Sequence, residues 1–383
     1  MGNGAVSGLR LPPSTSSPVV FVAILNWNSW RYTLRCLESV LRSDFERLRV
    51  IVCDNGSTDE SWQSMLAWAA GEVKPPMPTE SRLAALISSA QRRDVNISFV
   101  QADAARYSLE VQNADVIFLR RASNDGYAAG NNAAMNLSLA LGADYVWILN
   151  NDTLVEPSAA RRLVDYMKGQ PGIGMCGTTI MEYDNPHQIQ VLAGWNFDKW
   201  LARPRPTLAP FDARKRLSYV AGSSLFVSRK FLLEVGLLCE QYFLYCEELD
   251  WIQRANNRFS LGYCEDAVVY HKGGASVQTL PGAFGEYCSV RAGLLLTRKF
   301  WPLRLLTVLP AMLAWAFLRF IRGRWRGALV IICAVLTELG YRQENLESRL
   351  GLPKLALETL NQCRSRESLD TRSSDALSWS AQQ

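Results

Sequence analysis

Residues 19–61 read VVFVAILNWNSWRYTLRCLESVLRSDFERLRVIVCDNGSTDES, and this stretch decides the fold. Residues 19–25 form a continuous apolar run rich in β-branched side chains, which is typical of a strand buried on both faces of a parallel sheet. The amphipathic residues 29–42 predict a helix, and residues 48–53 predict a second strand, which a further helix follows through Ala70. This alternation predicts an α/β fold built on a Rossmann-like parallel sheet.

The same pattern continues along the chain after an irregular insertion at residues 71–95. In the first half we expect strands at 97–101, 116–119 and 145–149 and a helix at 131–141. In the second half we expect helices at 157–168 and 247–256 and strands at 178–183, 219–227 and 267–270. Ligands bind at the carboxyl ends of the strands in open sheets of this type, so polar residues that close strands are candidate site residues.

The composition is that of an ordinary globular protein, with 48% hydrophobic and 20% charged residues. The nine cysteines are scattered and form no C-x-x-C pair, which indicates neither a disulfide framework nor a zinc site and favours a reducing compartment. Residues 1–18 have no apolar segment behind a basic one, so we expect a disordered tail and not a secretory signal. Residues 172–177 match G-x-G-x-x-G but follow a helix and precede a strand, so we expect no NAD or FAD.

Asp54 and Asn55 close the second predicted strand in the sequence CDNGSTD. A carboxylate and an amide at this point can bond a pyrimidine N–H and a ribose hydroxyl, but the same residues can also form a turn that caps the next helix. The loop NDGYAAGNN at 124–132 contains two glycines that let the backbone approach a ligand. Here the alternative is a plain loop in which Asn131 or Asn132 caps the following helix.

Asn150, Asn151 and Asp152 close another predicted apolar strand. They offer hard oxygen ligands at a point where Mg²⁺ or Mn²⁺ can bridge two phosphates, whereas the alternative is a helix cap before Pro157. His271, one of two histidines, ends a predicted strand before a Lys-Gly-Gly segment. Its imidazole can bind the same cation.

Acidic residues open the helix predicted at 247–256. Acids are favoured at helix N-termini and Asp250 can pair with Arg254 one turn on, which accounts for Asp250 and for Glu247 without a function. Glu248 projects about 100° away from Glu247 around the helix, so it is free to face a cleft. There it can act as a general base.

Taken in order, seven segments resemble the family-2 glycosyltransferases, and the likeness runs from about Val19 to Phe300. The segments are ILNWN at 24–28, VCDNGSTDES at 52–61, NDGYAAGNN at 124–132, WILNNDT at 147–153, GSSLFVSR at 222–229, FLYCEELDW at 243–251 and YHKGGAS at 270–276. The subgroup that looks most similar is the rhamnosyltransferase-type enzymes that build bacterial surface polysaccharides, with galactofuranosyltransferases as relatives. The resemblance implies a GT-A fold, a divalent cation (Mg²⁺ or Mn²⁺) and inversion at the anomeric carbon.

The resemblance also implies roles for individual residues. Glu248 matches the catalytic base, with Glu247 and Asp250 as its neighbours, and Asp152 and His271 match metal ligands. The implied donor-binding residues are Asn26, Asp54, Asn55, Asn124, Gly126, Asn150 and Asp152. Two positions depart from the family pattern: Asn150 replaces the first acid of D-x-D, so protein charge at the metal rests mainly on Asp152, and the base is Glu in place of Asp.

The implied organisation is a nucleotide-sugar-binding half at 19–152, an acceptor-binding and catalytic half at 153–285, basic amphipathic helices at 286–345, and a C-terminal helix with a polar tail at 346–383. The expected partners are a nucleotide-diphosphate sugar, with rhamnose favoured, and a glycan or lipid-linked acceptor, without nucleic acid. Galactofuranose is the alternative sugar. A catalytically inactive nucleotide-sugar-binding relative and a nucleotidyltransferase are the alternative functions; the acids at 152 and 248 argue against the first, and the lack of a basic Gly-rich loop at 24–35 argues against the second.

Between Tyr287 and Thr337 the chain has eight Lys or Arg residues and no Asp or Glu. The longest uncharged runs there, 305–318 and 327–337, are shorter than the roughly 20 residues needed to cross a bilayer, so we expect no span. The basic and aromatic residues around these runs are Arg298, Lys299, Arg304, Arg319, Arg322, Arg324, Arg326, Trp301, Trp315 and Trp325. They favour helices that lie on an anionic membrane surface, which predicts a cytoplasmic protein, peripheral on the inner face of the cell membrane. The alternative is a helical pair packed on the catalytic domain.

Overall fold

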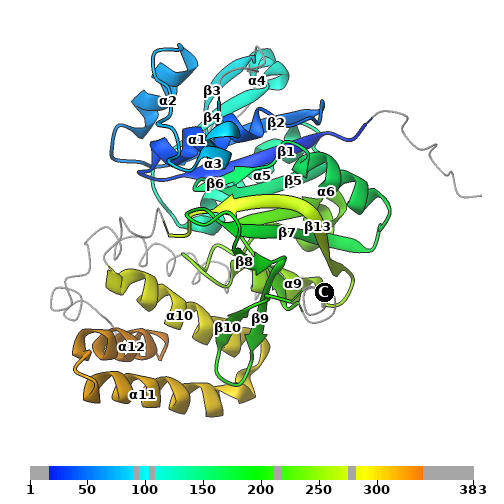
Figure 1. Cartoon of the computed structure of the whole chain (residues 1–383). Coiled ribbons are helices and arrows are strands. Elements are labelled where there is room, and N and C mark those ends of the chain that lie inside the picture. The colour runs from blue at the N-terminus through cyan, green and yellow to red at the C-terminus, as the bar shows by residue number, and fades with distance from the viewer. Residues whose placement is uncertain (1–16, 89–94, 103–107, 210–216, 275–281, 340–383) are drawn as a thin grey trace, which may run out of the picture.

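A computed structural model describes residues 17–88, 95–102, 108–209, 217–274 and 282–339 of the chain (Figure 1). Within these residues a ten-stranded sheet forms the centre, a three-stranded sheet lies beside it, and helices cover both faces of the large sheet. The prediction of an α/β fold with a parallel central sheet is confirmed. Residues 1–16 of the predicted tail and the whole predicted C-terminal segment 346–383 lie outside the described residues.

The strands of the large sheet are β1 Val20–Asn26, β2 Leu48–Asn55, β3 Ile97–Gln101, β4 Val116–Arg121, β5 Tyr145–Asn150, β6 Thr153–Val155, β7 Ile173–Glu182, β8 Ile189–Leu192, β12 Ser224–Ser228 and β13 Ser260–His271. Their order is β3-β4-β2-β1-β5-β12-β7-β13-β6, and β8 pairs with β7. The first five strands pair in parallel, with β1 between β2 and β5. Parallel pairing brings the carboxyl ends of these strands to one edge of the sheet.

The side chains of β1 alternate between two apolar layers. The helices on one face are α1 (Trp30–Val40), α2 (Ser61–Ala69) and α6 (Ala159–Lys168), and those on the other are α5 (Tyr127–Ala140), α8 (Arg229–Val235) and α9 (Glu247–Ala255). Val20, Val22 and Ile24 pack in the first layer, and Phe21 and Ala23 pack in the second. Both faces of β1 are therefore buried, which is why the run at 19–25 has no polar position.

Helix α5 begins earlier than predicted. It starts at Tyr127 after an N-cap at Gly126, where φ is 98°. Neither Asn131 nor Asn132 caps the helix, so this alternative was wrong. Asn131 Nδ2 donates to the Tyr127 carbonyl at 3.0 Å, and the Asn132 amide bonds the backbone of Leu238 from inside the helix.

Several strand boundaries also differ from the predictions. β7 begins at Ile173, so the G-x-G-x-x-G match opens a strand and not a helix. The stretch predicted as one strand at 219–227 divides into β11 (Tyr219–Val220) and β12, because a turn closed by Ser224 N and Ala221 O lies between them. β13 begins at Ser260 because its first half also pairs with β7. Short helices α3 (Ser81–Ala85) and α4 (Leu109–Asn113) lie outside the predicted set.

The C-terminal part of the described chain forms a helical layer of α10 (Gly282–Phe300), α11 (Leu305–Ile321) and α12 (Trp325–Glu338), which Figure 1 shows below the sheet. The small sheet of β9 (Gly194–Asp198), β10 (Arg203–Pro206) and β11 lies next to it. Lys299 of α10 places its Nζ 2.6 Å from Oδ2 of Asp250 in α9. This ion pair ties α10 to the catalytic domain. The alternative of a helical pair concerns residues 305–318 and 327–337, which lie in α11 and α12.

Residues 302–321, a short 3-10 turn followed by α11, form a helical stretch of 20 residues with mean hydropathy 1.6. By length and composition it is the one helix in the described part of the chain that can cross a membrane. This stretch is longer than the uncharged run 305–318 because the helical residues include Arg304 before the run and Arg319 after it. The expectation that it does not span a bilayer stays a prediction.

Candidate active site

Strand register brings three predicted site residues to one edge of the sheet. Asn26 of β1 stands opposite Asp54 of β2, and Leu25 stands opposite Asn150 of β5. Asn26 Nδ2 donates to Asp54 Oδ1 at 2.9 Å, and the Thr33 hydroxyl donates to Asn26 Oδ1 at 2.6 Å. The Asn26 amide therefore ties the ends of β1 and β2 to helix α1.

Asp54 is buried and does not cap the following helix. Its Oδ1 also accepts from the Ser57 hydroxyl, and its Oδ2 has no partner among the described residues. Burial raises the pKa of the Asp54 carboxyl above its ordinary value. Asp59 forms an Asx turn before α2, since its Oδ1 accepts from Ser61 N at 2.9 Å, but the N-cap of α2 is Glu60 and its side chain makes no capping bond.

A cavity of about 130 Å³, the first cavity below, lies at this edge of the sheet. The predicted donor-binding residues on its wall are Asn55, Asn124, Gly126, Asn150 and Asp152. Asn26 and Asp54 are not on the wall; they lie buried beneath it. Asn55 Nδ2 joins two of the wall residues by donating to Asn124 Oδ1 at 2.9 Å and to Gly126 O at 3.1 Å.

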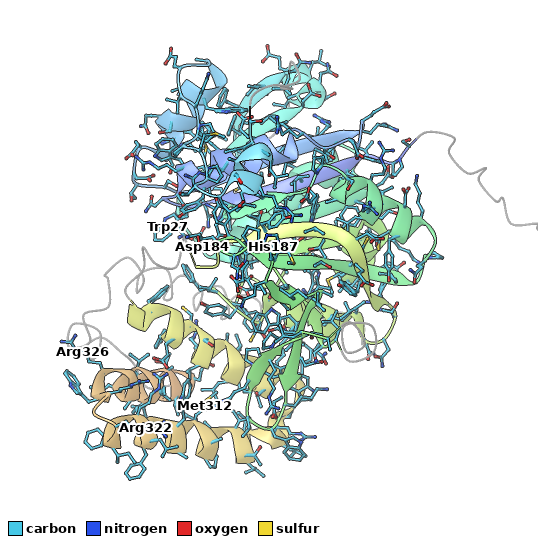
Figure 2. All side chains as sticks on the ribbon, in the orientation of Figure 1. Trp27, Asp184, His187, Met312, Arg322 and Arg326 are labelled. Atoms are coloured by element: carbon cyan, nitrogen blue, oxygen red, sulfur yellow. The ribbon has the colours of Figure 1, made fainter. Side chains whose placement is uncertain are left out.

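Sequence reasoning missed the apolar and aromatic part of this wall, which consists of Leu25, Trp27, Tyr127, Phe243 and Leu244. The Trp27 indole Nε1 is buried without a partner among the described residues, and Figure 2 shows Trp27 on the side of the sheet that faces the helical layer. Gly126 lies so close to Phe243 that a Cβ would stand 2.6 Å from its carbonyl oxygen. Trp27, Tyr127 and Phe243 all lie inside the motifs quoted above. Their position in these motifs was the sequence signal that could have identified them as wall residues.

Asp152, in the turn after β5, lies next to His271, the last residue of β13. His271 Nε2 lies 3.2 Å from Asp152 Oδ1, and Asn150 Nδ2 lies 3.4 Å from the same nitrogen. A carboxylate oxygen and an imidazole nitrogen at this spacing fit a divalent cation. Within the described residues no group of three or more His, Cys, Asp or Glu side chains converges to hold a metal. Asn150 and Asp152 cap no helix, because α6 begins after Ser158.

A second cavity, of about 400 Å³, adjoins the first. The two cavities share Tyr127, Asn150, Leu244 and Gly274, and His271 lies on the wall of the second. The wall also carries both Glu247 and Glu248 from the first turn of α9. Most of the remaining wall is apolar and includes Trp195, Phe197, Ala202, Pro204 and Leu244.

Glu248 packs against the backbone of Gly222. A Cβ at position 222 would stand 1.8 Å from Glu248 Oε1, so only glycine leaves room for this carboxylate. The Tyr127 hydroxyl donates to the Gly222 carbonyl at 2.8 Å and holds this segment in place. Burial raises the pKa of the Glu248 carboxyl to about 7, well above an ordinary glutamate.

The two other acids of α9 have different surroundings. Asp250 is fully buried, and two cations compensate its charge. Arg254 Nε lies 2.6 Å from its Oδ1, whereas Lys299 Nζ and the Tyr242 hydroxyl donate to its Oδ2. The predicted pairing of Asp250 with Arg254 is confirmed. Glu247 is buried with Oε1 unpartnered among the described residues, and burial together with the charge of Glu248 raises its pKa well above the ordinary value.

The backbone before α9 is strained. Tyr245 and Cys246 have φ of 75° and 69°, in the left-handed region that non-glycine residues rarely adopt. Such strain persists only where the surrounding structure enforces it, and it concentrates at functional sites. Here it turns the chain so that the first turn of α9, with Glu247 and Glu248, opens on the second cavity.

One family of known proteins matches more than half of the chain. The model of the family described as glycosyl transferase family 2 matches residues 21–77 and 79–236, which include Asp54 and Asp152 but end before Glu248 and His271. No curated protein matches the chain by sequence.

Three solved structures are similar over much of the chain. The mannosyltransferase PcManGT from Pyrobaculum calidifontis in complex with GDP-Man and Mn²⁺ is 14% identical, with a TM-score of 0.45 over 88% of this chain and 91% of that one. GalNAc-T7 with UDP, GalNAc and Mn²⁺ is 16% identical, with a TM-score of 0.48 over 66% and 43%. S. aureus TarS is 14% identical, with a TM-score of 0.43 over 83% and 49%.

The environment of Glu248 predicts its ionisation. Because burial disfavours the charged form, we expect the carboxyl to be protonated below pH 7 and ionised above it, with a midpoint of about 7 in place of 4.5. The measurement is ¹³C NMR of protein labelled at the glutamate side-chain carboxyl, with Glu248→Gln to assign the resonance. A midpoint at the ordinary glutamate value would show that the carboxyl is solvated.

Proposed function

Because the chain belongs to glycosyl transferase family 2, it is a glycosyltransferase, and we propose that it moves a sugar from a nucleotide-diphosphate donor to an acceptor hydroxyl with inversion. The observation that carries this proposal is the junction of the two cavities. Asn150 lines both of them, Asp152 and His271 lie at their junction, and Glu248 lies in the second. A donor in the first cavity and an acceptor in the second would meet at this junction.

The lining of the first cavity, which measures about 130 Å³, offers contacts for the base and ribose of a nucleotide. Asn124 offers an amide that Asn55 holds in place through a hydrogen bond. Trp27 offers an indole N–H that has no partner among the described residues, in a wall with aromatic faces. We assign nucleoside contacts to this wall and to Asp54 Oδ2, which lies beneath it without a partner among the described residues. Asn26 acts indirectly, since its amide orients Asp54.

Asp152 and His271 are the residues that we propose to hold a divalent cation, Mg²⁺ or Mn²⁺. When bound, such a cation neutralises the diphosphate and makes it a better leaving group. Asp152 supplies one negative charge and His271 a neutral nitrogen. Asn150, where the family pattern has an acid, supplies an amide in place of a second charge, so phosphate oxygens would provide most of the remaining ligand charge.

Glu248 is the proposed general base. The acceptor hydroxyl oxygen forms a bond to the anomeric carbon while the bond from that carbon to the diphosphate oxygen breaks on the opposite face, and the hydroxyl proton passes to Glu248. Its pKa of about 7 suits this role, because a base is most effective when its pKa is near the working pH. Gly222 fixes where the carboxylate stands.

The second cavity and the helical layer together suggest an acceptor at a membrane. Ala202 and Pro204, on the wall of this apolar cavity, belong to the segment around β10. This segment contacts α11, because the Thr307 hydroxyl of α11 donates to the Trp200 carbonyl at 3.0 Å. α11 exposes an apolar stripe made of Leu306, Leu313, Phe317 and Phe320. We propose that this stripe contacts an anionic membrane at its inner face, where a lipid-linked acceptor would be at hand.

Charged residues of the helical layer divide into two groups. Lys299 pairs with Asp250, and Arg319 pairs with Glu286, so these two have structural roles. Arg322 and Arg324 lie between α11 and α12, and Arg326 lies in the first turn of α12; all three are exposed. Figure 2 shows Arg322 and Arg326 on this layer. These three are the arginines that we assign to lipid headgroups.

The resemblance of the motif set to rhamnosyltransferase-type enzymes makes rhamnose the first donor sugar to test. Purified protein incubated with dTDP-, UDP- and GDP-sugars, with nucleotide release followed, identifies the donor.

The base assignment predicts the effect of Glu248→Gln. This change removes a proton acceptor but keeps the side-chain shape, so we expect kcat to fall by about 100-fold or more while donor affinity stays within about twofold. Glu234→Gln, the same change at an exposed position of α8, is the control and should leave both unchanged. A kcat within about tenfold of wild type, roughly 1.4 kcal/mol of barrier, would contradict the assignment.

The metal assignment predicts that Asp152→Ala and His271→Ala each weaken Mn²⁺-dependent donor binding by about tenfold or more, measured by calorimetry, because each removes one of two protein ligands. Asp184→Ala and His187→Ala are matched controls, since both side chains are exposed. Full transferase activity in excess EDTA would contradict a role for the metal.

The membrane assignment predicts that the protein floats with anionic liposomes at low salt and is released by high salt, because ions screen the arginine contacts. Phe317→Asp should abolish flotation, since it places a charge in the apolar stripe, whereas Leu233→Asp, an equally exposed position on α8, should not. No flotation of wild type would refute the surface contact. Retention after salt and carbonate washes would instead indicate that the 302–321 helix crosses the bilayer.

A further inference from the structure

Gln190 of β8 contacts the histidine of the proposed metal site and belongs to none of the sequence motifs. Its Oε1 lies 2.7 Å from His271 Nδ1. Its Nε2 donates to Glu182 Oε2 at 3.0 Å and to the His271 carbonyl at 3.2 Å. Glu182 and His271 are in register across β7 and β13, and β8 pairs with β7, so these three residues converge from neighbouring strands.

These contacts fix the orientation of the Gln190 amide. Both partners of its Nε2, a carboxylate and a carbonyl, can only accept hydrogen bonds. The flipped orientation would place Oε1 against two acceptors and lose both bonds. Oε1 therefore faces His271 Nδ1, and because Oε1 can only accept, Nδ1 must carry a proton.

A proton on Nδ1 leaves the neutral imidazole with a lone pair on Nε2. That nitrogen lies 3.2 Å from Asp152 Oδ1, another atom that presents lone pairs. Asn150 Nδ2 is a donor 3.4 Å away, beyond the usual length of a hydrogen bond. A cation between Nε2 and Oδ1 would accept a lone pair from each of these two atoms.

We propose that Gln190 is a positioning residue that holds His271 in the Nδ1–H tautomer, so that Nε2 is presented as a ligand to the divalent cation. The inference rests on the proposed function, since it concerns the same cation. Metal-bound histidines generally donate their other ring N–H to such a partner, and loss of the partner typically costs 10-fold to 100-fold in metal affinity. Gln190 does this through an amide that Glu182 in turn holds in place.

The first experiment determines the tautomer in the metal-free full chain. Long-range ¹H–¹⁵N NMR at about pH 8.5, where ordinary histidines are neutral, should show His271 protonated at Nδ1. The chain has only two histidines, so His187→Gln assigns the signals. Gln190→Leu, which has similar size but no hydrogen-bonding group, should lose the Nδ1–H signal. A wild-type His271 protonated at Nε2 would overturn the inference.

The second experiment measures Mn²⁺ affinity by electron paramagnetic resonance without donor. We expect Gln190→Leu to weaken binding about 10-fold to 100-fold. Gln188→Leu, the same change at an exposed position two residues away, should have no effect. The double variant Glu182→Gln/Gln190→Glu exchanges the amide and the carboxylate. It keeps an oxygen facing Nδ1 and a bond between residues 182 and 190 but loses the bond to the His271 carbonyl, so it should recover part of the affinity, which a merely structural defect would not allow.

The outcomes separate this inference from the proposed function. Equal Mn²⁺ affinity of wild type and Gln190→Leu would overturn the role of Gln190 and leave the metal-dependent transferase intact. Wild-type protein that binds no Mn²⁺ would contradict the metal site itself and with it this inference. Weakened binding in Gln190→Leu, recovered in the double variant, supports both.

Discussion

The parallel pairing of β1 with β2 and with β5 is the constraint on which the rest of the site depends. It aligns Asn26 with Asp54 and Leu25 with Asn150, so that the polar residues at the carboxyl ends of three strands lie at one edge of the sheet. The apolar runs behind these ends are buried on both faces, and a shift of one residue would exchange the two apolar layers. The same burial that makes the sheet stable therefore also fixes the positions of the polar groups at its edge.

Desolvated carboxylates distinguish the site from the rest of the fold. Asp250 is buried but compensated by Arg254 and Lys299, and it joins α9 to the helical layer. Glu247 and Glu248, on the same helix, have no such cation among the described residues, and burial raises the pKa values of both carboxyls. Leaving charges uncompensated is costly for a fold, and such perturbed groups concentrate where chemistry or ligand binding uses them. The contrast within one helix turn separates the structural acid from the candidate catalytic one.

Aromatic side chains and cations connect the site to the helical layer. Arg203, next to the cavity residue Ala202, lies over the Trp315 ring of α11, and Arg304 lies over Trp200. Arg304 and Trp315 are two of the residues whose charge and aromaticity first indicated a membrane surface. Their partners lie within the protein, so the surface contact that we propose depends instead on the exposed side chains of α11 and on the arginines that follow it. The segment around β10 thus borders the acceptor-side cavity and also contacts α11, which carries the exposed stripe.

The sequence by itself determined the strands of the parallel half and the separation of Glu248 from Asp250, because apolar runs and helical periodicity are local properties of the chain. It also indicated most of the polar residues on the wall of the first cavity, since they close strands. Only the tertiary structure decided that Asn26 and Asp54 lie beneath that wall, that Gly222 makes room for Glu248, and that Gln190 reaches His271. Each of these contacts joins residues far apart in the chain, and the packing of side chains across different strands has no periodic signature in the sequence.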